Sequence, residues 1–194
     1  MVQINDITYN LASEFHMLRH LEKVDFLVFK SLVREGYTKN EIDEQILLTG
    51  SKFKSLFAKD ILSLLKKFFQ YPFNEKIGSN GNLILECQVP KSDFPEGIGT
   101  NAIIPIKDIP EDKRKLVYLE KNRELNLLHF KVNFLPTTNT CTLILKPLSG
   151  GFSFVSAFPA LAAMPIPNKS MNSELYNNCK KFWENHVFLK EMSQ

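Results

Sequence analysis

The sequence predicts an α+β protein, in which a helical N-terminal part precedes a four- to five-stranded, mainly antiparallel sheet and a C-terminal helix closes the fold. Apolar residues recur at helical spacing as far as Phe69, and from Leu83 onward they alternate or form short runs between turn signals. A helical pattern then returns after Asn172. We therefore expect a helical part at 1–75 and an α+β domain at 76–194.

Three helices are expected in the N-terminal part. Gly36 ends the first, because glycine readily takes the left-handed conformation at a helix C-terminus. Thr38 and Glu41 have the spacing of a capping box and predict the start of the second. Pro72 and the Asn80–Gly81 pair are strong breakers and indicate a linker before the sheet. In order, the expected elements are helices at 12–35, 38–48 and 51–69 and a linker at 70–82.

Short strands separated by turn signals are expected in the C-terminal part. The two glycines at 150–151 stand between two apolar runs and predict a hairpin. The charged segment 110–122 is compatible with one short helix. The last helix carries His186 near its apolar stripe. The expected strands, in order, lie at 83–89, 101–106, 124–135, 140–146 and 152–158.

Composition places the chain among globular proteins and excludes several functional classes. Of 194 residues, 44% are hydrophobic and 23% charged, and the net charge of +3 permits an anionic partner without requiring one. The three cysteines, Cys87, Cys141 and Cys179, are scattered, so we expect reduced packing thiols in a cytoplasmic protein. We expect no secretory signal, no membrane span and no nucleotide-binding glycine loop, because none of their patterns is present.

The strand at 124–135 carries the best candidate for chemistry. Alternation predicts that His129, Lys131 and Asn133 share one face while Phe130, Val132 and Phe134 share the other. His129 and Lys131 would then lie roughly 7 Å apart along the strand. Histidine titrates near neutral pH and lysine supplies a fixed positive charge, a pairing that suits phosphate chemistry. An ordinary solvent-facing strand is the alternative.

Other polar groups carry weaker signals. His186 is more typical of a core or edge residue, although it would meet His129 if the last helix packed beside the central strands. His16 and His20 share a helix face, but no third metal ligand is evident and we expect no metal site. Arg114, Lys115 and Arg123 belong to a basic cluster, which fits either a phosphate-contacting patch or a solvated surface.

The helices expected at 38–48 and 51–69 have the layout of a helix-turn-helix. Gly50 lies in the turn, and Lys52, Lys54 and Ser55 would open the second helix, close to phosphates or base edges. An ordinary helical hairpin with solvated lysines is equally compatible with this degenerate pattern.

The C-terminal half resembles a known group of proteins. The "GIGTNAIIPI" segment precedes the strand bearing His129, and a hairpin leads to a strand ending in Ser156-Ala157-Phe158-Pro159. Together these residues resemble the metal-independent endoribonuclease toxins of the barnase–EndoU–colicin–RelE group, over roughly residues 83–190. The resemblance implies RNA cleavage by attack of the 2′-OH, without cofactor or metal.

Roles for individual residues follow from that resemblance. His129 would be a general acid or base, Lys131 would stabilise the phosphorane, Ser156 would hold a phosphate oxygen and His186 would be the second acid–base group. The basic cluster would contact RNA, and a protein antidote is an expected partner. Strict alternation, however, puts Ser156 on the same face as Phe152, Phe154 and Phe158, the expected core side, unless a bulge redirects it.

Two alternatives to an enzyme stay open on these observations. One is a nucleic-acid-binding or protein-interaction module that uses the helical N-terminal segment. The other is an interaction or ligand-binding protein built around the 16 phenylalanines. We expect no membrane association, and the sequence leaves the oligomeric state open.

Overall fold

A computed structural model of the chain describes residues 2–48, 50–78, 80–109, 116–122, 125–132 and 134–191. Of residues 116–122, 125–129, 131, 190 and 191 it describes the backbone alone. The fold class is α+β, as predicted: helices lead the chain, the main sheet is mostly antiparallel and a helix occurs near the C-terminus. The chain forms two compact units, unit 1 (Met1–Thr100 with Thr137–Leu161) and unit 2 (Asn101–Pro136 with Ala162–Gln194).

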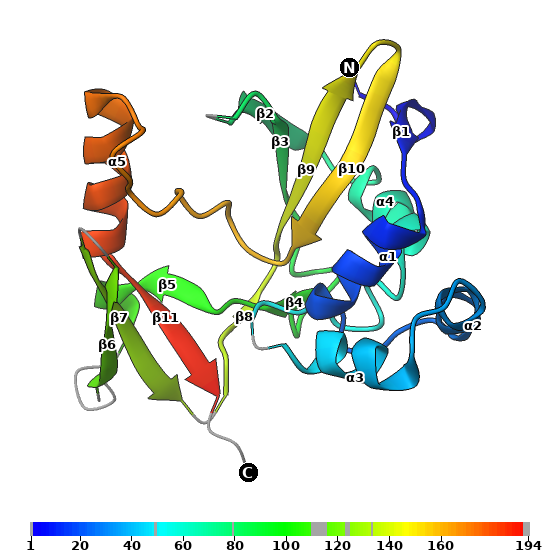
Figure 1. Ribbon diagram of the computed structural model, residues 1–194, viewed down its shortest axis with the longest axis horizontal. Helices are drawn as coiled ribbons and strands as arrows, with labels where there is room; N and C mark the ends of the chain where they lie inside the picture. Colours follow the sequence, from blue (N-terminus) through cyan, green and yellow to red (C-terminus); the bar gives the residue numbers. More distant parts are fainter. Residues whose placement is uncertain are drawn as a thin grey trace. The chain divides into compact units, whose positions relative to one another are not determined.

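Unit 1 contains a five-stranded sheet with the order β1-β10-β9-β3-β2. The short β1 runs parallel to β10, and the other neighbours are antiparallel. Figure 1 shows β9 and β10 as a long hairpin, which confirms the turn predicted at the glycine pair. A two-stranded ribbon, β4-β8, completes the unit. The strands are β1 (Ile7–Thr8), β2 (Phe73–Ile77), β3 (Leu83–Gln88), β4 (Gly99–Thr100), β8 (Thr137–Thr138), β9 (Thr140–Leu148) and β10 (Gly151–Phe158).

Four α-helices of unit 1 begin at side chains that accept a hydrogen bond from the first turn. The caps are Asn10, Asp25, Thr38 and Asp60, and the predicted capping box of Thr38 with Glu41 is confirmed. Gly36 follows the second helix with φ of 101°, as expected of a residue that ends a helix. The helices are α1 (Leu11–Met17), α2 (Phe26–Arg34), α3 (Lys39–Leu47) and α4 (Ile61–Phe68).

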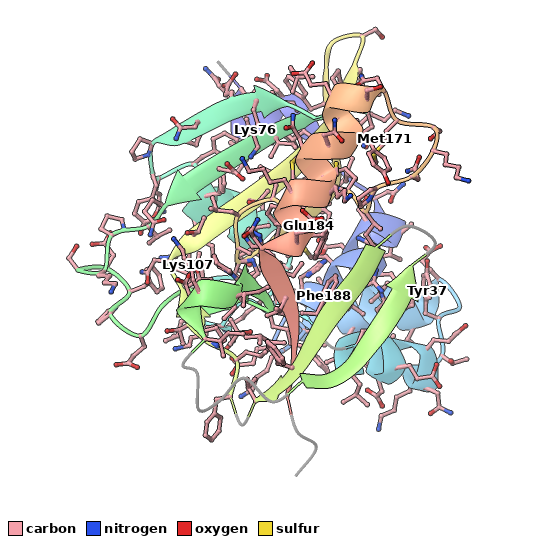
Figure 2. The ribbon with its side chains drawn as sticks, turned by 90° about the vertical axis from the view of Figure 1, so that its left-hand side faces the viewer. Tyr37, Lys76, Lys107, Met171, Glu184 and Phe188 are labelled. Atoms are coloured by element: carbon pink, nitrogen blue, oxygen red, sulfur yellow. The ribbon has the colours of Figure 1, made fainter. Side chains whose placement is uncertain are left out.

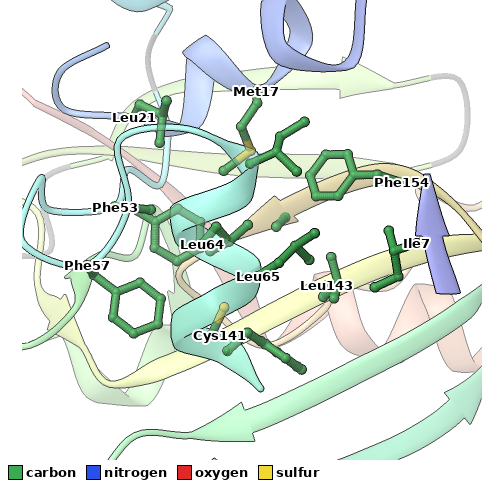
Figure 3. Close-up of a cluster of buried hydrophobic side chains, with 14 of the residues drawn as sticks. Ile7, Met17, Leu21, Phe53, Phe57, Leu64, Leu65, Cys141, Leu143 and Phe154 are labelled. Carbon is green, nitrogen blue, oxygen red and sulfur yellow. The ribbon is translucent and has the colours of Figure 1, made fainter. Parts of the chain in front are cut away.

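The core of unit 1 lies between the helices and the sheet. Figure 3 shows Leu64 and Leu65 of α4 close to Leu143 and Cys141 of β9, with Phe57 beside them. All five side chains are buried. Because a fully buried leucine or phenylalanine contributes about 1.5–3 kcal/mol, this cluster accounts for the packing of α4.

Unit 2 contains a four-stranded sheet with the order β5-β11-β7-β6 and the helix α5. β11 runs antiparallel to β5 and parallel to β7, and β6 and β7 are antiparallel. Asn172 caps α5 by accepting a hydrogen bond from Leu175. The elements are β5 (Ile103–Pro105), β6 (Leu116–Asn122), β7 (Leu125–Val132), α5 (Ser173–Glu184) and β11 (His186–Glu191).

The helical prediction is wrong at two places in unit 1. The helix expected at 12–35 is two helices, because the chain passes through a 3₁₀ turn, Leu18–His20, and Asp25 then caps a new helix. The helix expected at 51–69 is α4 alone, since Phe53 bridges Leu21 and Gly99 and Asp60 starts the helix. No recognition helix therefore opens at residue 51.

The lysines proposed for that recognition helix bind backbone carbonyls instead. The Nζ atom of Lys52 donates to the carbonyl of Ile46, and the Nζ atom of Lys54 donates to the carbonyl of Glu96 at 2.6 Å. Both cations thus tie the loop 51–60 to other segments of unit 1. Over the described residues 38–48 and 50–69, the predicted helix-turn-helix is not present.

Three further segments, predicted to be linker or helix, contain strands. The linker expected at 70–82 contains β2, which pairs with β3 across the Asn80–Gly81 turn. The short helix considered for 110–122 is β6 over its described part. The last helix ends at Glu184, and His186 opens a strand. Helix α4 ends at Phe68 and strand β2 begins at Phe73. The expected domain boundary after residue 75 stays a prediction.

Candidate functional site

Two candidate segments lie on neighbouring strands of unit 2. Phe188 of β11 pairs in register with His129 of β7, and Lys190 pairs with Lys131. His186 is two residues before Phe188, which Figure 2 labels on the strand following α5. From strand spacing and rise, the backbone positions of His129 and His186 are roughly 8 Å apart. His186 therefore lies near the strand of His129. The contact arises because β11 pairs with β7, and not because the last helix packs beside the central strands.

Three contacts fix the position of His186, two with Phe182 and one with Pro105. Its Nδ1 atom lies 2.7 Å from the carbonyl oxygen of Phe182, and its ring stacks on the Phe182 ring at 3.8 Å. Its backbone pairs with Pro105 of β5. A carbonyl beside Nδ1 favours the tautomer with the proton on that atom, so Nε2 becomes the proton-accepting nitrogen. The half-buried ring is therefore fixed in orientation, as an acid–base group requires.

Trp183 anchors the segment before α5 next to this site. Its Nε1 atom donates to the carbonyls of Met164 and Pro165, at 3.0 and 3.2 Å. Its ring stacks on Phe188 at 4.8 Å. One indole thus joins the end of α5 and β11 to Met164 and Pro165, and it fixes the path of the chain at these two residues.

Ser156 does not keep the face given by strict alternation, because the bulge considered as the exception is present. A bulge between Phe154 and Ser156 shifts the register, so Phe154 pairs with Leu145 while Ser156 pairs with Ile144. Val155 is the extra residue and is exposed. Ser156 thereby leaves the row of Phe152 and Phe154, yet it is still buried. It belongs to unit 1, and nothing in its described surroundings assigns it a role in phosphate binding.

Several predicted site groups fall outside what the structure describes. Arg114, Lys115, Arg123 and Asn133 lie outside the described residues. For His129 and Lys131 the strand register is known. Phe130 and Val132 join the small core of unit 2, as alternation predicted, whereas Phe134 follows the end of β7 and is exposed.

His16 and His20 form a second histidine pair, in unit 1. Their ring centroids are 6.2 Å apart, and Nδ1 of His20 lies 3.1 Å from the carbonyl oxygen of Ser51. Burial, with the nearby charges of Arg19 and Lys52, lowers the pKa of His20 to about 4, so its imidazole is neutral. Among the described residues no group of three or more potential metal ligands gathers.

Glu14 is a buried carboxyl group that the sequence did not single out. It lies on α1 beside core residues, and both its oxygens face the backbone N–H of Ile61 at the start of α4, at 3.3 and 3.2 Å. Its position on the same helical stripe as Met17 and Leu18 was the available signal, since an acidic residue within an apolar stripe becomes buried.

Comparisons of the chain with protein-family models, with curated proteins and with solved structures gave no match. None of the helices among the described residues combines the length and hydropathy of a bilayer span.

Proposed function

We propose that this chain is a metal-independent endoribonuclease whose centre lies on β7 and β11. The observation that carries the proposal is the register of the two strands, which places His129 and Lys131 opposite Phe188 and Lys190, with His186 two residues away. Two histidines and two lysines thus occupy a small area of one sheet. Such a set supplies both proton transfers and the positive charge that phosphodiester cleavage needs.

In the proposed reaction the 2′-oxygen of a ribose attacks the adjacent phosphorus and the bond to the 5′-oxygen breaks. One histidine takes the proton of the 2′-OH, and the other gives a proton to the leaving 5′-oxygen. His186 suits the role of base, because Nδ1 faces a carbonyl and leaves Nε2 to accept the proton. Lys131 and Lys190 would stabilise the charge on the phosphorane, and the products are a 2′,3′-cyclic phosphate and a 5′-hydroxyl.

Substrate and partner follow from this activity. The basic residues Arg114, Lys115 and Arg123 would contact the RNA backbone, and an RNA target predicts activity in the cytoplasm. A cell that produces such an enzyme needs protection, which supports a protein antidote as partner. Ser156 has no part in the proposed reaction.

The test is incubation of the purified chain with total RNA in EDTA. The wild type should release fragments ending in 2′,3′-cyclic phosphate, and His129→Ala and His186→Ala should each slow cleavage by about 100-fold or more. Lys180→Ala is the control on the exposed side of α5 and should cleave at the wild-type rate. Intact RNA with folded wild type, or cleavage at the wild-type rate in either histidine variant, would disprove the proposal.

One observation favours the alternative of a protein-interaction module. Phe26 and Leu27 at the start of α2 and Leu47 at the end of α3 are exposed by 64%, 70% and 77%. Large exposed apolar side chains of this kind are common where a partner binds. If folded protein leaves RNA intact, binding through the helical part becomes the preferred function.

A further inference from the structure

Two cysteines far apart in the sequence lie directly opposite each other in unit 1. Cys87 of β3 pairs in register with Cys141 of the antiparallel strand β9. Both are free and buried, and the Cys87 thiol is near enough to help raise the pKa of Cys141. Side chains of directly opposed residues stand on the same face of a sheet, which explains the thiol contact.

The Cα spacing expected of directly opposed strand residues falls within the range of disulfides. Opposed residues in antiparallel strands have Cα atoms about 5.5 Å apart in a hydrogen-bonded pair and about 4.5 Å apart in the other kind of pair. Disulfides usually join residues whose Cα atoms are about 4.4–6.8 Å apart. Both kinds of pair fall within that range of Cα distances. Opposed Cβ atoms are about 4.5–5.5 Å apart and those of a disulfide about 3.5–4.5 Å, so joining Cys87 to Cys141 requires the two Cβ atoms to approach by about 1 Å.

We propose that Cys87 and Cys141 form a cross-strand disulfide when the folded protein meets a small disulfide oxidant such as oxidised glutathione. The thiolate of one cysteine attacks a glutathione sulfur, forming a mixed disulfide and releasing one glutathione thiolate. The second cysteine thiolate then attacks the protein sulfur of that mixed disulfide and releases the other glutathione. Two thiol protons leave, and the two electrons reduce one glutathione disulfide to two thiols.

Burial controls the rate of this reaction. Burial and the contact with Cys87 raise the pKa of Cys141, so little thiolate forms while the strands are closed. The pair is one position from the last pair of the ladder, Gln88 with Thr140, whose side chains share a hydrogen bond of 2.8 Å. Opening of this end of the ladder gives the oxidant access, because strand ends open more readily than strand centres.

The bond would join two inner strands of the five-stranded sheet. Cys87 and Cys141 belong to segments on either side of the residues that form the first part of unit 2. A cross-link between them limits the freedom of the unfolded chain, and it should therefore raise the melting temperature of the oxidised protein. Cys179, on α5 of unit 2, is an internal reference thiol.

The full-length native protein is incubated with oxidised glutathione in a mildly alkaline buffer, then unfolded with N-ethylmaleimide present, and its intact mass and peptides are measured. We expect one alkylated cysteine, Cys179, and a linked peptide containing Cys87 and Cys141, whereas the reduced protein is alkylated at all three. The oxidised protein should also melt at a higher temperature.

Cys141→Ala serves as the matched variant and should give no internal bond. Because that variant tests only specificity, the wild-type result decides the proposal. Three alkylated cysteines after oxidation, a glutathione adduct that persists on Cys87 or Cys141, or a Cys87–Cys141 bond that forms only in denaturant would each overturn it.

Discussion

Glu14 brings a titrating carboxyl group into the core of unit 1. Burial raises its pKa from 4.5 to about 7, with Asp60 and Asp25 acting in the same direction and the N–H of Ile61 opposing them. The folded state therefore favours the protonated carboxyl. Its contribution to stability is fully present below the unfolded pKa and is lost as the pH rises towards 7.

Glu14→Gln should remove this pH dependence, since glutamine keeps an oxygen for Ile61 and does not ionise. One pKa step corresponds to about 1.4 kcal/mol, so the free energy of unfolding of the variant should exceed that of the wild type by up to about 3 kcal/mol at about pH 8. Near pH 4 the two should agree. Urea unfolding at several pH values measures the difference, and a constant difference would contradict the assignment.

The contribution of His20 to stability has the opposite pH dependence to that of Glu14. Its pKa falls from 6.5 to about 4 in the folded state, mainly by burial. Its contribution to stability is therefore fully present above pH 6.5 and is lost as the pH falls towards 4. Between pH 4.5 and 6.5 the effects of Glu14 and His20 largely cancel. Unfolding curves of Glu14→Gln should therefore reveal a stability that rises with pH there, and His20→Gln should abolish that rise.

At the scale of elements, the ribbon β4-β8 depends on the absence of a side chain at Gly99. A Cβ atom there would lie 2.6 Å from Pro159 and closer still to the carbonyl oxygen of Lys52. Neither the backbone of residue 52 nor a proline ring yields easily. The close approach holds the loop 51–60 and the end of β10 against the same ribbon.

Gly99→Ala should consequently destabilise unit 1 by about 2 kcal/mol or more, the usual cost of an overpacked site. Gly81→Asn is the control, because Gly81 has φ of 78° with open space around it and asparagine tolerates that conformation. Thermal unfolding compares the two variants. A loss in the Gly81 variant as large as that in the Gly99 variant would show that the close contact is unimportant.

At the scale of the molecule, two units with separate cores should report separately on unfolding. Trp183 is the single tryptophan and lies in unit 2, so its fluorescence follows that unit, whereas far-UV circular dichroism follows both. Leu85→Ala in the core of unit 1 should cost about 3 kcal/mol and shift the circular dichroism midpoint. The fluorescence midpoint should move less, and equal shifts would indicate one cooperative fold.

Local signals in the sequence were sufficient for several features of the fold. The capping box at Thr38, the helix stop at Gly36 and the hairpin between β9 and β10 depend on residues within a few positions of one another. Such signals act through hydrogen bonds and backbone preferences that form locally. The fold class follows from the same periodicities.

Long-range pairing decided the rest. Residues 186–191 form a strand because β5 and β7 lie on either side of β11, and segment 51–60 is not helical because Phe53 bridges distant residues. The face of Ser156 depends on a bulge, and the opposition of Cys87 and Cys141 depends on a register between strands more than fifty residues apart. Contacts between remote segments override local propensity, because the burial and backbone hydrogen bonds gained in a sheet exceed the small preferences of single residues.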